Sequence, residues 1–255
     1  MESMEWLAER LAEIPGVVAV TLGGSRAQGL DRDDSDWDFG LYYEGVIDPD
    51  DVRVLGYEGT VVAPGEWAYP MNGGAWLMVH GQRVDLLYRD RADVDRWTAE
   101  AADGRWELFG VPGYLCGMPS YVLAGEAAVG RLLAGRLEQP EFPDLLRVQG
   151  PARWRWEARY SLECAATHAA QRDVASCVGH CACAIVAVAQ ARMLERGEWA
   201  LNEKGIVRRA GLADVEELMR DSRDALSLVE DVRDGLETSS GGLDPDGSSP
   251  DSRSP

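Results

Sequence analysis

The chain has 255 residues, 45% of them hydrophobic, which is enough for one large or two small domains with a buried core. Its 44 acidic residues outnumber its 25 basic ones, so the formal net charge is −19. Because proteins bind nucleic-acid phosphates mainly through clustered Lys and Arg, this balance argues against a general nucleic-acid binder and suits a small or cationic partner.

The location of the protein is indicated by three further patterns. Met1–Trp6 carries acid where a secretory signal carries basic residues, and no apolar stretch follows it. The most apolar window, Cys181–Ala191, is too short to span a bilayer and indicates a buried helix. The 5 cysteines are clustered, and their odd number fits reduced thiols. We therefore expect a cytoplasmic protein without a membrane segment.

The first half of the chain predicts alternating helices and strands. In chain order we expect a helix over Met4–Glu13, strands over Val17–Leu22 and Trp37–Tyr43, a short helix near Asp48–Leu55, a hairpin of Ala75–His80 and Arg83–Tyr88 turning at Gly81-Gln82, and a helix over Asp90–Ala102. The run Val17–Leu22 is closed by two glycines, so a glycine turn follows the carboxyl end of a strand.

The second half of the chain predicts helices. Gly110–Pro119 is rich in Gly and Pro and indicates a domain boundary, which we place after residue 113. Helices are expected over Tyr121–Leu137, Ala152–Ala170, Val174–Arg196 with Asp173 as N-cap, and Val215–Leu236, giving a helical domain over residues 114–237. Residues 238–255 are mostly Ser, Gly, Pro and Asp, which predicts a disordered tail.

Two acidic side chains alternate along the second predicted strand. Asp36 and Asp38 are two residues apart, so both carboxylates face the same side of a strand, and two acids that face one point need a cation between them. Asp85 lies on the hairpin between apolar neighbours that point the other way. We therefore expect Asp36, Asp38 and Asp85 to share two Mg²⁺ ions, which prefer oxygen ligands.

The glycine turn that precedes these acids has the size of a phosphate site. The backbone N–H groups of Gly24 and Ser25, with the Ser25 hydroxyl, can hold phosphate oxygens, because only small residues let the backbone come so close. Together the turn and the acids predict a site for a nucleoside triphosphate and its magnesium, with the α-phosphorus open to in-line attack.

Two common phosphate- and metal-binding motifs require a spacing that this segment does not have. The turn lacks the Lys and Ser or Thr that a P-loop requires after its second glycine. An EF-hand that started at Asp34 would need Gly in place of Phe39 and Glu in place of Gly45. A solvated acidic loop that includes Asp31 and Asp33 remains the simplest alternative, and it does not account for the strand alternation or Asp85.

This arrangement resembles the nucleotidyltransferase fold of the DNA polymerase β superfamily, whose signature is Gly-Ser, a spacer, Asp-x-Asp, and a later Asp or Glu. The matching elements here are Gly24-Ser25, Asp36-x-Asp38 and Asp85. The helical half, with Gln171–Val174 and Leu201–Gly205, is similar to the small-molecule nucleotidyltransferases that include the aminoglycoside-modifying enzymes.

The resemblance implies an α/β (α+β) nucleotidyltransferase domain with a mixed sheet over residues 1–113, and an all-α helical-bundle domain that forms the other wall of a cleft. It implies a metal-dependent enzyme that transfers a nucleoside monophosphate, AMP from ATP, to a hydroxyl of a small molecule such as an aminoglycoside, and releases pyrophosphate. The alternatives are a protein-adenylylating enzyme of the antitoxin type and a nucleotide-binding regulatory protein without turnover. The sequence specifies neither the acceptor molecule nor the oligomeric state of the protein.

Three further side chains have both a functional and a structural interpretation. Arg26 would pair with a phosphate or neutralise the neighbouring acids. Lys204 would reach the triphosphate or remain an exposed lysine between helices. Glu163 would take the proton from the acceptor hydroxyl or be an ordinary surface residue, since a metal beside Asp85 can activate the hydroxyl without it.

Four residues have spacings that would allow a structural zinc site across an antiparallel helix pair: Cys164, His168, Cys177 and Cys181. The alternative is that these small thiols are buried in a helical core, where free cysteines are common.

Overall fold

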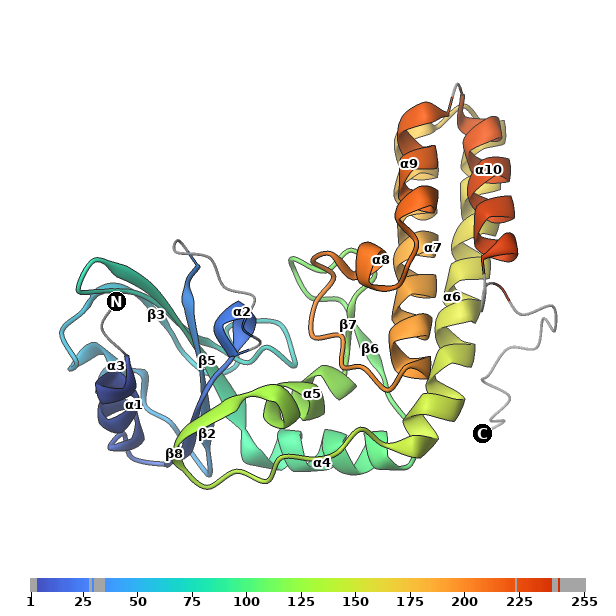
Figure 1. Ribbon diagram of the computed structural model, residues 1–255. Helices are drawn as coiled ribbons and strands as arrows, with labels where there is room; N and C mark the ends of the chain where they lie inside the picture. Colours follow the sequence, from blue (N-terminus) through green and yellow to red (C-terminus); the bar gives the residue numbers. More distant parts are fainter. Residues whose placement is uncertain (1–3, 28, 30–34, 223, 240–242, 244–255) are drawn as a thin grey trace. The chain divides into compact units, whose positions relative to one another are not determined.

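The computed structural model describes residues 4–27, 29, 35–222, 224–239 and 243 (Figure 1). The chain divides into two compact units. The first consists of Met1–Ala101, Trp106–Pro112 and Met118–Glu141, and the second of Ala102–Arg105, Gly113–Gly117 and Phe142–Pro255. Expectations that fall on Met1–Ser3, on residues 31–34 and on most of the tail lie outside the described residues.

The first unit contains a mixed six-stranded sheet. Its strands are β1 (Val17–Leu22), β2 (Trp37–Tyr43), β3 (Glu58–Val62), β4 (Gly74–Val79), β5 (Gln82–Asp90) and β8 (Arg131–Gly135), in the order β3-β4-β5-β2-β1-β8. Strands β2 and β5 pair in parallel, and the other neighbouring pairs are antiparallel. The helices are α1 (Glu5–Ala12), α2 (Gly24–Ala27), α3 (Pro49–Arg53), α4 (Arg91–Ala102) and α5 (Tyr121–Val129), with a two-stranded ribbon of β6 (Leu108–Phe109) and β7 (Met118–Pro119).

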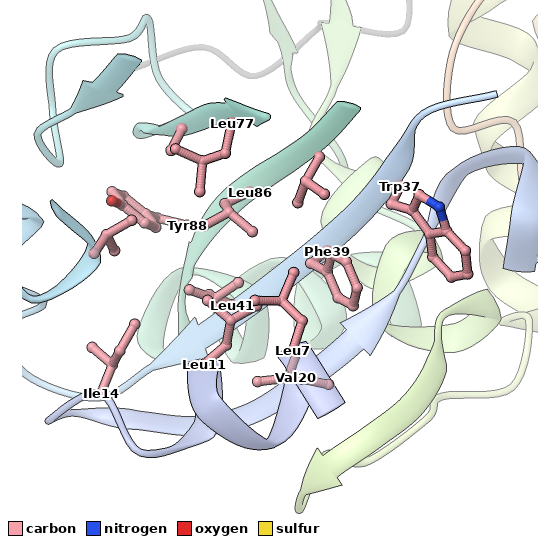
Figure 2. Close-up of a cluster of buried hydrophobic side chains, with 14 of the residues drawn as sticks. Leu7, Leu11, Ile14, Val20, Trp37, Phe39, Leu41, Leu77, Leu86 and Tyr88 are labelled. Atoms are coloured by element: carbon pink, nitrogen blue, oxygen red, sulfur yellow. The ribbon is translucent and has the colours of Figure 1, made fainter. Parts of the chain in front are cut away.

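One face of the sheet forms the core of this unit. Alternate residues of β2 and β5 are buried in one cluster with α1, which includes Leu7, Phe39, Leu41, Leu86 and Tyr88 (Figure 2). Because side chains alternate along a strand, the residues between them face the other side of the sheet.

The opposite face is covered at one end. There the guanidinium of Arg89, 2% exposed, donates to both carboxylate oxygens of Glu126 on α5 at 2.6 and 3.0 Å. Tyr42 is buried at the same end of β2. Towards the start of β2 and β5 the same face is more open, because Asp38 and Asp85 are only half-buried and Arg83 is exposed. The candidate site lies at this open end.

The predicted hairpin is present, with its turn one residue earlier than expected. Strands β4 and β5 are joined by His80 and Gly81, whose φ values of 50° and 79° are both positive. Positive φ at both loop residues is the geometry that matches the right-handed twist of a two-residue hairpin.

The expected helix over Tyr121–Leu137 is half correct. Helix α5 ends at Val129, and the extended Gly130 leads into β8, which pairs with the outer edge of β1. The first unit therefore continues to Glu141, beyond the boundary expected at residue 113, because its sheet takes a strand from the later sequence. Gly130 permits this close passage, since a Cβ there would lie 2.8 Å from a backbone oxygen of Glu126.

The second unit is helical, as expected, which confirms the predicted combination of a mixed sheet with a helical region. It contains α6 (Asp144–Ala170), α7 (Val174–Glu195), α8 (Ile206–Arg209), α9 (Ala213–Asp221) and α10 (Ala225–Thr238). Asp173 caps α7 by accepting from the amide of Ser176, as predicted. The helix expected over Val215–Leu236 is two helices, because Asp224 begins a new one by capping Leu226 and Ser227.

Helix α7 is the apolar centre of this unit, where it packs along α6 (Figure 1). By length and composition it is the one helix among the described residues that could cross a membrane, and 56% of its most apolar window is buried. The apolar stretch is thus longer than the window Cys181–Ala191, and its burial fits the predicted core helix.

Candidate active site

The glycine turn after β1 touches the carboxylate of Asp38. The amide of Gly23 donates to the backbone oxygen of Asp38 at 2.7 Å, which ties the turn to β2. Gly24 has φ +60°, and a Cβ on it would lie 1.8 Å from Oδ2 of Asp38. Only glycine accommodates both the left-handed backbone and this contact. The turn and Asp38 therefore form one unit of structure.

Asp38 and Asp85 lie side by side. They are register partners on the parallel strands β2 and β5, so their backbones are about 4.8 Å apart and their side chains share a face. Their neighbours Trp37 and Val84 are also partners and point into the core. The strand expected to supply a further carboxylate is thus the immediate neighbour of the strand that carries Asp38.

Asp36 lies just before β2 and pairs with Arg83. Its Oδ1 is 2.5 Å from Nε of Arg83, and the two side chains are 38% and 63% exposed. Within residues 4–27, 29, 35–222, 224–239 and 243, no three His, Cys, Asp or Glu side chains form a group able to hold a metal ion. The three acids therefore share a face and one end of the sheet, but they do not form a closed metal cluster in this arrangement.

Arg26 connects the turn to the start of β2. Its guanidinium donates to the backbone oxygens of Ser35 at 2.6 Å and Asp36 at 3.1 Å, and it lies 4.4 Å from the centroid of the Trp37 ring. This side chain holds the segment that carries the acids. Ser25 follows Gly24 in α2 and is half-buried.

A groove of about 510 Å³ adjoins the acids on the open face of the sheet. It is lined by acidic, basic and apolar residues from three strands and their flanks: Asp36, Glu58, Gly59, Trp76, Leu77, Met78, Arg83 and Asp85. Trp76 and Glu58 were not among the residues singled out from the sequence. The alternation in β4, where exposed Trp76 and Met78 interrupt the buried Ala75, Leu77 and Val79, is the signal that could have identified the tryptophan.

The candidates from the helical half lie in the second unit. Lys204 is exposed, and its amide donates to Oδ1 of Asn202 at 2.9 Å. Glu163 lies 3.6 Å from Arg233 in an exposed ion pair. Glu203, in the same short motif as Lys204, accepts from the amides of Leu115 and Cys116 at 2.5 and 2.9 Å, so this acid fixes a loop.

The residues whose spacing would have allowed a zinc site have structural roles. Cys177 and Cys181 are buried in α7, and burial raises the pKa of both thiols, that of Cys181 to about 12. Nδ1 of His168 lies 2.9 Å from Oδ2 of Asp173. No metal-binding group forms here among the residues that the structure describes. These side chains are part of a helical core and its cap.

Comparison with known proteins gives a structural likeness only. No protein-family model matches the chain, and no curated protein matches it either. Among solved structures, a nucleotidyltransferase-like protein from Exiguobacterium sibiricum is similar, with 14% identity and a TM-score of 0.43 over 92% of this chain and 73% of the other.

Proposed function

We propose that this protein is a nucleotidyltransferase that transfers AMP from ATP to a hydroxyl of a small molecule and releases pyrophosphate. The observation that carries the proposal is the contact between the Gly24 turn and Asp38, beside the in-register Asp85. A phosphate-sized turn and two carboxylates on one sheet face are the parts that this reaction needs, and the sequence supplies them in the Gly-Ser, Asp-x-Asp order of the nucleotidyltransferase signature.

The donor chemistry of the site suits magnesium. Carboxylate oxygens of Asp36, Asp38 and Asp85 are the ligand type that Mg²⁺ prefers, and Asp36 would exchange its contact with Arg83 for the cation. When bound, two such ions would neutralise the triphosphate and polarise its α-phosphorus. We therefore propose that these three acids bind Mg²⁺ and that ATP is the substrate.

Backbone and side-chain groups of the protein would hold the phosphates and take up the proton of the acceptor. Gly24 and Ser25 would hold the β- and γ-phosphate oxygens through their backbone N–H groups, so that pyrophosphate leaves towards the turn. Arg26 would keep the segment around Asp36 in place. The carboxylate of Asp85 would accept the proton of the acceptor hydroxyl as that oxygen attacks the α-phosphorus.

The surface charge favours a cationic acceptor. The formal net charge of the chain is −19, and among the described residues three carboxylates and one guanidinium line the groove, Asp85 included. An aminoglycoside, which offers both ammonium groups and hydroxyls, fits this chemistry. We also propose a cytoplasmic location for the enzyme, because its clustered cysteines fit reduced thiols and its proposed substrate is a small molecule.

The decisive experiment follows label from ATP. The protein is incubated with [α-³²P]ATP, MgCl₂ and a panel of aminoglycosides, and labelled products are separated by chromatography. Wild type should label an acceptor, whereas Asp38→Asn and Asp85→Asn should each reduce transfer by at least about 100-fold, because each removes a charge that acts on the reacting atoms. Glu44→Gln, an exposed carboxylate at the far end of β2, is the matched control and should keep full transfer.

Two results would favour a different function. Label that appears on the protein itself or on added protein, with none on small molecules, would indicate a protein-adenylylating enzyme. ATP binding without transfer to any acceptor would indicate a nucleotide-binding regulatory protein. Equal transfer by wild type and by both Asn variants would contradict the assignment of these acids.

A further inference from the structure

Four residues in register form a row across the open face of the sheet. Asp38 on β2 pairs with Asp85 on β5, Asp85 pairs with Trp76 on β4, and Trp76 pairs with Thr60 on β3. Adjacent strands are about 4.8 Å apart, so the indole of Trp76 begins one strand from Asp85 and about 10 Å from Asp38. A large aromatic ring thus lies directly beside the proposed reaction centre.

Trp76 is exposed and supported from one side. Trp76 is 50% exposed to solvent, although its neighbours Ala75 and Leu77 are buried in the core. The ring of Trp67 lies against it, with centroids 4.8 Å apart and an interplanar angle of 37°. Trp67 approaches over Gly74, where a Cβ would be 3.1 Å from its indole. The two rings form a prepared aromatic surface, which we call the tryptophan platform.

The loop that carries Trp67 is fixed to the body of the unit. The amide of Gly65 donates to the backbone oxygen and to Oδ1 of Asn72 at 2.7 and 3.0 Å. The side-chain amide of Asn72 donates to the hydroxyl of Tyr43 on β2 at 2.7 Å. Because the loop is held in this way, the tryptophan platform exists before any ligand arrives, which lowers the entropic cost of binding.

The charge around the platform selects for cations. Glu58 on β3 is exposed and lines the same groove as Trp76 and Asp85. In the metal-free protein Arg83 is paired with Asp36. Among the described lining residues, Asp36, Glu58 and Asp85 face this one guanidinium, so the lining is net negative. An ammonium group above the indole would be attracted both by the ring face and by these carboxylates.

The direction of the reaction assigns this platform to the acceptor. An in-line displacement requires the attacking oxygen opposite the leaving group. If pyrophosphate leaves towards the Gly24 turn after β1, the attack arrives across β2 and β5 from the β4 side, because the strand order is β4-β5-β2-β1. On that side, next to Asp85, lies Trp76.

We propose that the tryptophan platform and Glu58 bind the acceptor, an amino sugar whose ring stacks on Trp76 and whose ammonium pairs with Glu58. This inference rests on the proposed function, since it uses the direction of nucleotidyl transfer. It adds the specificity-determining residues Trp76 and Glu58, which select rings that carry positive charge over neutral sugars of the same size.

Binding without ATP or metal tests the platform separately from catalysis. Isothermal titration with kanamycin should give a saturable heat for wild type, whereas the neutral trisaccharide maltotriose should give none. Trp76→Ala should weaken kanamycin binding roughly tenfold, the value of a desolvated ring–cation contact, and Trp76→Phe should restore part of it. Glu58→Gln should weaken it as well and reduce its dependence on salt. Trp156→Ala, in the second unit, is the control for loss of an indole.

Kinetics on the transfer reaction separates the possible failures. Trp76→Ala should raise the KM for the acceptor roughly tenfold and leave the KM for ATP within about twofold. A raised KM for ATP alone would mean that the platform stacks the nucleobase, and it would overturn the proposal. Equal kanamycin affinity in wild type, Trp76→Ala and Glu58→Gln would overturn it too. Platform-dependent kanamycin binding without any label transfer would support the binding site and contradict the proposed reaction.

Discussion

Substitution of Gly24 by alanine should remove the function of the site without unfolding the protein. The new Cβ would lie 1.8 Å from Oδ2 of Asp38, whereas real Cβ contacts stay at 3.0 Å or more, so the carboxylate must retreat by about 1.2 Å. A misplacement of about 1 Å in a catalytic group costs on the order of 100-fold in rate. The left-handed backbone at φ +60° adds about 1–2 kcal/mol of local strain.

Two measurements on Gly24→Ala check this reasoning. Transfer of label should fall on the order of 100-fold, and Mn²⁺ binding in the presence of ATP, followed by electron paramagnetic resonance, should weaken because Asp38 has moved. Gly45→Ala is the matched control: its φ is +78°, and no described atom lies within 4 Å of its Cβ position, so it carries the strain without the clash. Wild-type rate and Mn²⁺ affinity in a folded Gly24→Ala protein, or an equal loss in Gly45→Ala, would refute the role given to this contact.

Two further predictions concern other parts of the chain. The hydrogen bond from the Cys116 thiol lowers the pKa of Cys183, while burial raises that of Cys177, so near neutral pH iodoacetamide should modify Cys183 before Cys177. Cys116→Ser should change the pH at which Cys183 reacts, as peptide mass spectrometry over a pH series would measure, and an unchanged profile would contradict the shared hydrogen bond. Glu126→Ala should destabilise the first unit by about 3–5 kcal/mol in urea unfolding, because it leaves the buried charge of Arg89 without this carboxylate. The double variant Arg89→Met with Glu126→Leu should recover most of that stability. A double variant no more stable than Glu126→Ala would contradict the role given to the buried charge of Arg89.

The strands that carry the site could be predicted from the sequence, because the residue patterns that specify them are local. Val17–Leu22 is a β-branched run closed by glycines, and Trp37–Tyr43 alternates apolar and small or acidic residues, so both strands agree with the structure to the residue. Asp85 could be predicted to face away from the core, because it alternates with the apolar Val84 and Leu86 on the second strand of the hairpin. Periodicity within a segment was sufficient for these elements.

The features that the sequence did not reveal depend on pairing between distant segments. Arg131–Gly135 has no strong alternation of its own and becomes a strand because the edge of β1 accepts it. The contact between Asp36 and Arg83 follows from the register of β2 against β5, which no local pattern specifies. Trp76 acquires its place beside Asp85 in the same way. Long-range register, rather than propensity, decided these positions.

The position of β8 at the edge of the sheet has a consequence for synthesis of the chain. Strand β1 pairs with β2 on one side, but its other edge is closed only by residues made more than a hundred positions later. Until then the nascent sheet presents an open edge of backbone N–H and C=O groups, which other chains can pair with. Emergence of residues 131–135 from the ribosome is therefore the step that covers the long apolar edge strand β1 and leaves the shorter β8 as the edge on that side.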